Sequence, residues 1–267
     1  MKVMNNPNIN IKQKLKNSET VTQVGIQNNY TGLSPEEACK LATNLFLENF
    51  PKLQEEASKI IKERVDELMF KVVENIHKKN IKDLSSFKDP DVQYILIEAQ
   101  KNYARFNNSI DLLAELIVNR IECNDDDTIL KIATDNAIKI VPFLSQKELN
   151  YLSLLFLLKE VKFPDINSIE KLKEHFELLN STFPNVSKSS QNYLVSLSCL
   201  QIGLIDITEI HSSSYNLVLN DVKKIIPDTF KELNGDYITT HIGKIIAMIN
   251  AEKLMNTTFD KKIWIHS

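Results

Sequence analysis

The stretch that decides the fold covers residues 31–57 and opens with Thr31-Gly32-Leu33-Ser34-Pro35-Glu36-Glu37-Ala38. Ser34 is typical of a helix N-cap, Pro35 of the first helical residue, and Glu37 completes a capping box with the cap. Apolar residues at helical spacing follow the box, namely Leu41, Ala42, Leu45 and Phe46. The pattern predicts that a helical body begins here, after a polar N-terminal tail.

A second apolar stripe at helical spacing extends from Leu53 to Ile76. Its members are Leu53, Ala57, Ile60, Ile61, Val65, Leu68, Met69, Val72 and Ile76. A helix of this length is a rod of roughly 36 Å. Because it is the longest periodic segment of the chain, we expect the stripe to be buried and the rest of the body to pack against it.

The composition is that of a soluble globular protein. The 267 residues are 43% hydrophobic and 25% charged, with a formal net charge of -3. This balance gives no reason to expect a general nucleic-acid binder. Cys39, Cys123 and Cys199 have no zinc-ligand spacing and do not suggest a disulfide framework. We expect a cytoplasmic protein without a transmembrane segment, a cofactor or a metal site.

Capping signals and prolines predict further helices between residues 92 and 179. Ser145 and Glu148 form a second capping box, which opens the strongly apolar segment Leu149–Val161. Ser109 is interpreted as the cap of an earlier helix, and Asn167 with Glu170 as the cap of a later one. The sequence therefore predicts a mainly α fold with several helices.

The segment Ser181–Ser189, which contains proline and serine, is the best internal boundary. The predicted organisation is a flexible tail at 1–32, a helical body at 33–182 and a small α+β portion at 183–267. In the last portion, Ser190–Ile202 is predicted as a helix that ends at Gly203. A short strand is predicted at residues 204–207. Tyr237-Ile238 then leads to Thr239-Thr240, which caps the helix Ile242–Met255.

Two features of this C-terminal portion resemble the later half of a winged helix, and also the C-terminal part of abortive-infection proteins of the alpha type. They are Leu200-Gln201-Ile202-Gly203-Leu204-Ile205 and Tyr237-Ile238-Thr239-Thr240-His241-Ile242-Gly243-Lys244. About thirty residues separate them, more than a simple wing needs. The resemblance implies a recognition helix at Ser189–Gly203, which offers Gln191, Asn192 and Gln201 but no Lys or Arg. A structural or protein-binding winged helix is therefore favoured over a DNA-binding one.

Residues 21–30, Val-Thr-Gln-Val-Gly-Ile-Gln-Asn-Asn-Tyr, carry no charge. They resemble the core of the RHIM-type amyloid signalling motif, with matches at Gln23, Val24, Gly25, Asn28 and Tyr30. Thr22 departs from the aliphatic residue usual before Gln. The resemblance implies self-assembly by cross-β stacking, in which amide side chains align along the stack. An ordinary polar tail or a strand docked on the body is the alternative.

Gly32-Leu33-Ser34-Pro35-Glu36-Glu37-Ala38, followed by Asn49-Phe50-Pro51-Lys52-Leu53, resembles the opening of an uncharacterised family of bacterial proteins associated with phage defence. That resemblance gives no information about an activity. The leading hypothesis is a non-enzymatic interaction or effector protein of anti-phage defence or regulated cell death. It would bind itself or a protein partner through residues 21–30.

The alternative hypothesis is a winged-helix transcriptional regulator that binds DNA. An enzyme ranks third, because the sequence contains no HExxH, GxSxG, Walker A or GxGxxG pattern. The five histidines are scattered along the chain. We therefore predict no catalytic residue and no metal ligand.

Overall fold

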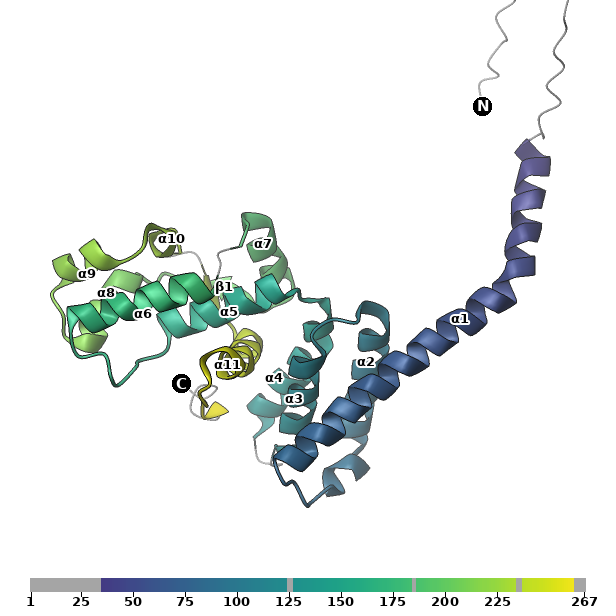
Figure 1. Ribbon diagram of the computed structural model, residues 1–267, viewed down its shortest axis with the longest axis horizontal. Coiled ribbons are helices and arrows are strands. Elements are labelled where there is room, and N and C mark those ends of the chain that lie inside the picture. The colour runs from purple at the N-terminus through teal and green to yellow at the C-terminus, as the bar shows by residue number, and fades with distance from the viewer. Residues whose placement is uncertain (1–34, 124–126, 184–185, 234–236, 262–267) are drawn as a thin grey trace, which may run out of the picture. The chain divides into compact units, whose positions relative to one another are not determined.

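The computed structural model describes residues 35–123, 127–183, 186–233 and 237–261 (Figure 1). The chain divides into two compact units, Met1–Lys52 and Leu53–Ser267. The described residues are mainly helical, as the sequence predicts, and contain one two-stranded sheet. Predicted features at residues 1–34, including the cap at Ser34, lie outside this description.

Helix α1 extends from Pro35 to Lys78 and is the longest element. The predicted stripes at 31–57 and 53–76 thus belong to one helix, with Pro51 in its interior. The remaining elements of the first half are η1 (Ser85–Lys88), α2 (Pro90–Phe106), α3 (Ile110–Glu122), α4 (Thr128–Ile140), η2 (Val141–Phe143) and α5 (Gln146–Lys159).

The second half begins with α6 (Ile169–Thr182) and α7 (Lys188–Ser196). Strand β1 (Leu200–Ile202) pairs antiparallel with β2 (Tyr237–Thr239), with Gln201 opposite Ile238. In the described part of the chain between the two strands lie three short helices, α8 (Ile207–Tyr215), α9 (Leu219–Ile225) and α10 (Asp228–Lys231). Helix α11 (His241–Met255) follows β2.

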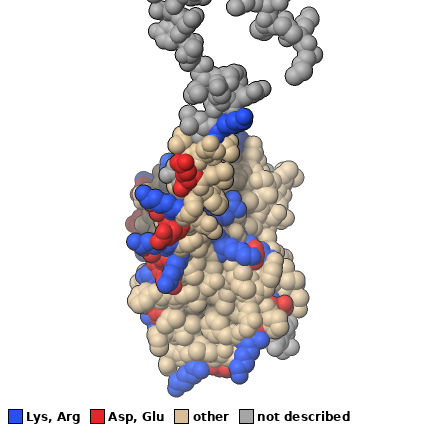
Figure 2. Space-filling view, turned by 90° about the vertical axis from the view of Figure 1, so that its right-hand side faces the viewer, with Lys and Arg blue, Asp and Glu red and all other residues tan. Residues whose placement is uncertain are grey.

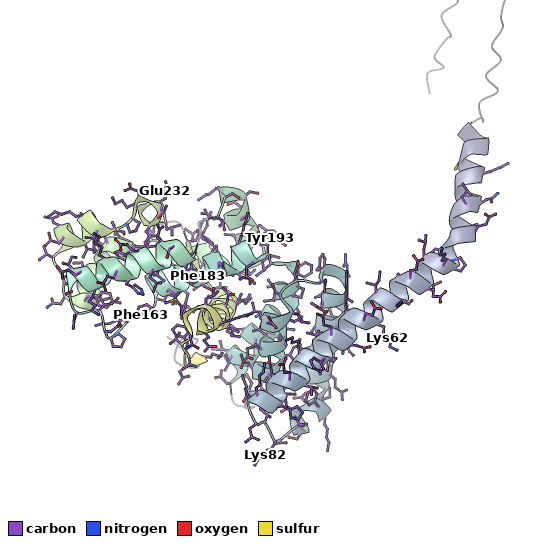
Figure 3. The ribbon with its side chains drawn as sticks, in the orientation of Figure 1. Lys62, Lys82, Phe163, Phe183, Tyr193 and Glu232 are labelled. Atoms are coloured by element: carbon purple, nitrogen blue, oxygen red, sulfur yellow. The ribbon has the colours of Figure 1, made fainter. Side chains whose placement is uncertain are left out.

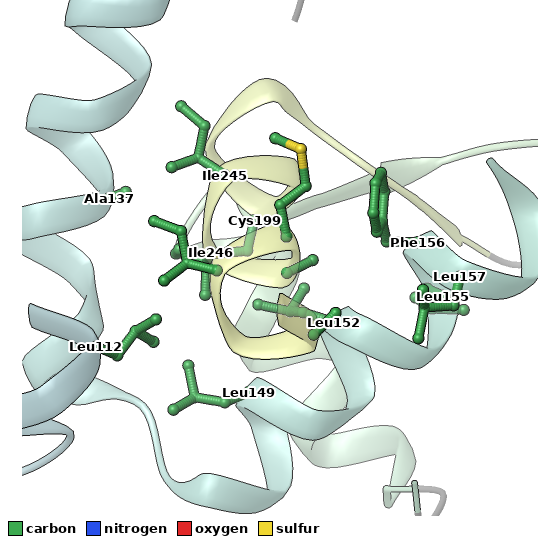
Figure 4. Close-up of a cluster of buried hydrophobic side chains, with 14 of the residues drawn as sticks. Leu112, Ala137, Leu149, Leu152, Leu155, Phe156, Leu157, Cys199, Ile245 and Ile246 are labelled. Carbon is green, nitrogen blue, oxygen red and sulfur yellow. The ribbon is translucent and has the colours of Figure 1, made fainter. Parts of the chain in front are cut away.

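The core of the second unit is centred on α5 and α11. Every residue of α5 from Tyr151 to Lys159 is buried, and so is every residue of α11 from Ile245 to Ala251. Figure 4 shows Leu149 and Leu152 of α5 beside Ile246 of α11, with side chains of α3 and α4 at the edge of the cluster. The two central helices are apolar around most of their circumference, which is the composition that a fully buried helix requires.

The predicted burial of the α1 stripe is wrong over half of its length. Leu68, Val72 and Ile76 are buried, whereas Leu53 and Ile60 are about half exposed. Arg64 donates to the carbonyl oxygen of Ala104 at 2.6 Å, and residues 53–63, which precede it, are all exposed. Helical periodicity identifies an apolar face, but burial also needs an element that covers this face.

Two predicted elements of the C-terminal portion are also wrong. Helix α7 ends at Ser196, and Ser198 has a positive φ of 57°. Residues 200–202 therefore form a strand and do not continue the helix. The segment 204–207 is not a strand, because Asp206 caps α8 by accepting the backbone N–H of Thr208 at 2.7 Å.

Local capping chemistry explains most helix starts. The capping box of Ser145 and Glu148 is present, and Thr240 caps α11 by accepting the N–H of Gly243. Ser109 stands at the start of α3 with a φ of 58° but makes no side-chain cap hydrogen bond. Ser168, and not the predicted Asn167, caps α6. Within the described ranges, no helix is both long enough and apolar enough to cross a membrane.

Candidate functional site

The residues that the sequence predicts for self-assembly are Gln23, Val24, Gly25, Asn28 and Tyr30. All five belong to residues 1–34, outside the part of the chain that the structure describes. The geometry of a site therefore comes from the helices, where two features stand out. One is the exposed face of α1, and the other is a charged cavity in the second unit.

Helix α1 exposes several large apolar side chains among its charged and polar ones. In the second unit, every residue from Leu53 to Glu63 is exposed, and Lys62 extends from this part of the helix in Figure 3. Leu53, Ile60 and Ile61 are 51%, 47% and 50% exposed. Among the described side chains of the first unit, Leu45, Leu47 and Phe50 are large, apolar and exposed. Apolar side chains gathered on an exposed helix are typical of an interaction surface.

The charged cavity has a volume of about 590 Å³ and lies in the second unit, between α1, α3, α5 and α11. Lysines and carboxylates surround it, with amide side chains and a few aliphatic side chains among them. The polar residues of its lining are Lys71, Asn75, Lys78, Ser109, Asp111, Glu115, Gln146, Asn250, Glu252 and Lys253. The cavity therefore offers donors and acceptors of both charge signs.

Ion pairs organise the charges of this cavity. Asp111 lies 3.0 Å from the Nζ atom of Lys253 and 3.6 Å from that of Lys71. Glu74 pairs with Lys78 at 2.9 Å and with Lys71 at 3.1 Å. The hydrogen bond from Lys253 lowers the pKa of the Asp111 carboxyl, and Glu74 raises the pKa of Lys71. Both groups therefore stay charged near neutral pH, so they are better suited to binding than to proton transfer.

A network of amides and a hydroxyl lies beneath the cavity and joins α5 to α11. Asn250 donates to the Oγ atom of Ser153 at 2.9 Å, and Ser153 donates to the carbonyl oxygen of Ala247 at 3.1 Å. At the exposed end of this network, Gln146 donates to Asn150 within α5 at 2.7 Å and to Asn250 of α11 at 3.3 Å. Buried polar groups that are satisfied in this way fix the register of two apolar helices, because a shift would leave them unpaired.

The motif Thr240-x-x-Gly243-Lys244 has a packing role. A Cβ atom on Gly243 would lie 2.0 Å from the carbonyl oxygen of Cys199, so only glycine allows α11 to approach the chain this closely. Lys244 pairs with Glu160 at 2.8 Å, and both side chains are mostly buried. A smaller cavity of about 330 Å³ borders this pair. Thr240, Gly243 and Lys244 thus each have a structural role.

Sequence reasoning missed the groups that are far apart in the chain. Arg120 and Asp135 form a largely buried ion pair at 2.7 Å. Burial raises the pKa of Asp135, and Arg120 opposes this shift. The sequence does show polar residues within apolar helices, such as Arg120 in α3 and Asn250 in α11. No pattern in the neighbouring sequence identifies the residues that they contact.

One of the described histidines, His211, lies in the protein core. Among the described residues, no group of three or more His, Cys, Asp or Glu side chains is placed to hold a metal ion. His211 is buried in α8, where its ring stacks on Tyr215 and meets Phe176 edge-on. Burial lowers the pKa of His211 to about 4, with a smaller contribution from His175. His211 is therefore neutral at pH 7 and belongs to the aromatic core.

In a comparison with known protein families, a family model matches residues 32–236 of the chain. No curated protein matches the chain. No solved structure matches it either.

Proposed function

The chain belongs to the family whose model matches residues 32–236, and on that premise we propose that it is a non-enzymatic interaction or effector protein. It acts in bacterial anti-phage defence or regulated cell death, and it assembles through the RHIM-like segment 21–30. The segment precedes the matched region, which suits an assembly motif placed before a folded module.

One observation carries this proposal: α1, which follows the proposed assembly segment in the sequence, exposes large apolar side chains. Leu53, Ile60 and Ile61 are each about half exposed in the second unit. A monomeric protein gains nothing by leaving such side chains in water, since burying one contributes about 1.5–3 kcal/mol. An exposed apolar helix next to an uncharged, amide-rich segment favours a chain that binds other chains.

Assembly would act by raising the local concentration of the helical body. When many copies of the chain are held on one cross-β stack, their helical bodies are concentrated in a small volume. Contacts between the bodies then form even if each contact has low affinity. The paired lysines and carboxylates of the charged cavity support a binding role for the body. Lys71 and Asp111, two described residues of that cavity, both keep their charges near neutral pH. Neither residue is therefore suited to general acid–base catalysis.

The DNA-binding alternative has weaker support. It rests on the region of α7, β1, β2 and α11, whose sequence resembles part of a winged helix. Gln191 is buried, however, and Asn192 accepts a hydrogen bond from Tyr237 at 3.3 Å. The ammonium of Lys188 lies 4.7 Å from the centre of the Tyr237 ring. Side chains engaged within the protein are poorly placed to contact bases or phosphates, which favours a structural or protein-binding role for this portion.

The distribution of surface charge also favours protein binding over DNA binding. On the face in Figure 2, lysines and arginines alternate with acidic side chains and form no large patch of one sign. A nucleic-acid interface needs a basic footprint. An interaction with protein therefore fits this face better than one with DNA.

A peptide covering residues 21–30 tests the proposed function. We expect it to form cross-β fibrils, which thioflavin fluorescence and fibre diffraction detect, because identical amides and apolar side chains can stack in register. The matched control carries Gln23→Asp and Asn28→Asp, which place like charges in every layer about 4.8 Å apart. The control should stay monomeric.

The same two substitutions in the full chain should abolish large assemblies and leave the melting temperature unchanged. A wild-type peptide that stays monomeric at high concentration would remove the assembly motif. Fibrils that persist in the doubly substituted peptide would rule out an in-register amide stack.

A further inference from the structure

The charged cavity of the second unit has the size and the mixed lining of a small-molecule site. Its volume of about 590 Å³ lies within the range of known ligand pockets, roughly 300–1,000 Å³. Three buried aliphatic residues line it, namely Leu112 of α3, Leu149 of α5 and Ile249 of α11. The half-buried Asn75 and the buried Asn250 add amide groups. Such a lining suits a ligand that has an apolar part and a polar part.

Two of the carboxylates in the lining are neutralised by lysines outside it. Glu115 pairs with Lys79 at 2.6 Å, and Glu252 pairs with Lys261 at 3.2 Å. Neither Lys79 nor Lys261 belongs to the described lining of the cavity. The charges of Glu115 and Glu252 are therefore compensated from behind, and they contribute little to the field inside the cavity.

The remaining charges form a continuous series of ion pairs that begins and ends with a lysine. In order, the members are Lys78, Glu74, Lys71, Asp111 and Lys253. All three lysines line the cavity, whereas Glu74 lies outside its described lining. Three ammonium groups thus face two carboxylates. The series leaves one positive charge over, which favours an anionic ligand.

We propose that the charged cavity binds a small organic anion that has one negative charge and an apolar body. The anionic group lies among the ammonium groups of Lys71, Lys78 and Lys253, and the apolar body contacts the aliphatic residues. Ser109 also lines the cavity and makes no side-chain cap hydrogen bond, so its hydroxyl group is able to donate to the anion. This site for a small molecule is separate from the proposed contacts between chains.

The experiment titrates the full chain with anilinonaphthalene sulfonate, a singly charged aromatic anion whose fluorescence rises on binding. The chain carries Gln23→Asp and Asn28→Asp, so that no cross-β stack competes for the dye. We expect saturable binding at one site. The neutral analogue phenylnaphthylamine, which lacks the charge, and inorganic phosphate, which lacks the apolar body, should both bind more weakly. Added salt should weaken binding of the anionic dye, because salt screens exposed charges.

Substitutions in the ion-pair series test the sign of the charge effect. Lys78→Gln or Lys253→Gln should weaken binding of the dye by about three- to tenfold, because each removes a positive charge beside the anion. Asp111→Asn should strengthen binding by a similar factor, since it removes a negative charge. Glu74→Gln gives a second test of strengthening, on a different helix. Circular dichroism checks that each variant stays folded.

Two control variants separate the cavity from the rest of the surface. Lys173→Gln removes the same charge from α6, where Lys173 pairs with Glu177 at 3.8 Å. Ile60→Asp alters an apolar side chain of α1 that is 47% exposed and lies outside the described lining of the cavity. Neither substitution should change the affinity for the dye.

Three results would overturn the proposal. One is the absence of saturable dye binding, and another is equal binding of the neutral analogue. The third is weaker binding in both Asp111→Asn and Glu74→Gln, which would show that the ion pairs only maintain the shape of the cavity. None of these results depends on whether the peptide 21–30 forms fibrils, so failure of the ligand site is distinguishable from failure of the assembly motif.

Discussion

Helices α1 and α5 are both rich in large apolar residues, yet they differ in burial. In α5, all residues from Tyr151 to Lys159 are buried, because α11, α8 and β2 pack around it. In α1, all residues from Leu53 to Glu63 are exposed. The comparison teaches that apolar content marks a surface that needs a partner. Whether that partner is another element of the same chain or another molecule depends on the tertiary structure.

The largest expected effect separates the two helices directly. Leu152→Asp in α5 places a carboxylate in the core, beside α11, and should cost several kcal/mol, enough to unfold the second unit. Leu53→Asp in α1 should change the free energy of unfolding by about 0.5 kcal/mol or less at low protein concentration. Urea denaturation followed by circular dichroism measures both. Similar losses for the two variants would show that α1 is as much a core helix as α5.

A smaller effect tests how α11 covers α5. Gly243→Ala places a Cβ atom 2.0 Å from the carbonyl oxygen of Cys199, and a backbone atom can give way only if α11 shifts. We expect a loss of about 3 kcal/mol or more in the free energy of unfolding. Gly203→Ala is the matched control, because its Cβ atom would meet only side-chain atoms of Ile238. Equal losses would contradict the close approach of α11.

The smallest expected effect is a dependence of stability on pH. His211 has a pKa of about 4 in the folded protein, below its ordinary value of 6.5. The folded state therefore binds fewer protons than the unfolded state between these values. The contribution is fully present above pH 6.5 and is lost as the pH falls toward 4, by roughly 2–3 kcal/mol.

His211→Phe keeps an aromatic ring beside Tyr215 and Phe176 and should remove this part of the pH dependence. His77→Phe on α1 is the control, since His77 is exposed. Thermal melts of both variants between pH 7 and pH 4 make the comparison. An unchanged slope for His211→Phe would mean that acid destabilisation arises elsewhere.

Much of the helical architecture could be predicted from local signals. Ser145 with Glu148, and Thr240 before α11, place a cap hydrogen bond within three residues, so the sequence alone carries the information. Asn107 ends α2 in the left-handed conformation, which Asn adopts more readily than most other residues. The failure at residues 197–207 has a local cause as well. Ser198 adopts a positive φ. Because positive φ is uncommon for residues other than glycine, the sequence does not predict this turn.

The candidate site could be predicted only in part. The apolar face of α1 is visible in the sequence, although its exposure is not. The charged cavity was missed, because Asp111 and Lys253 are separated by 142 residues and meet only through the packing of α3 and α11. Single charged residues on helices look alike in a sequence, whether they line a cavity or face solvent.

The sequence by itself determined the fold class, most helix starts and the apolar faces, because side-chain periodicity and capping act within a few residues. The tertiary structure alone decided which faces are covered. It placed α5 and α11 at the centre in place of α1, and it joined Glu160 to Lys244 and Asn250 to Ser153. These outcomes depend on contacts between residues tens to a hundred positions apart, and such contacts leave no periodic trace in the chain.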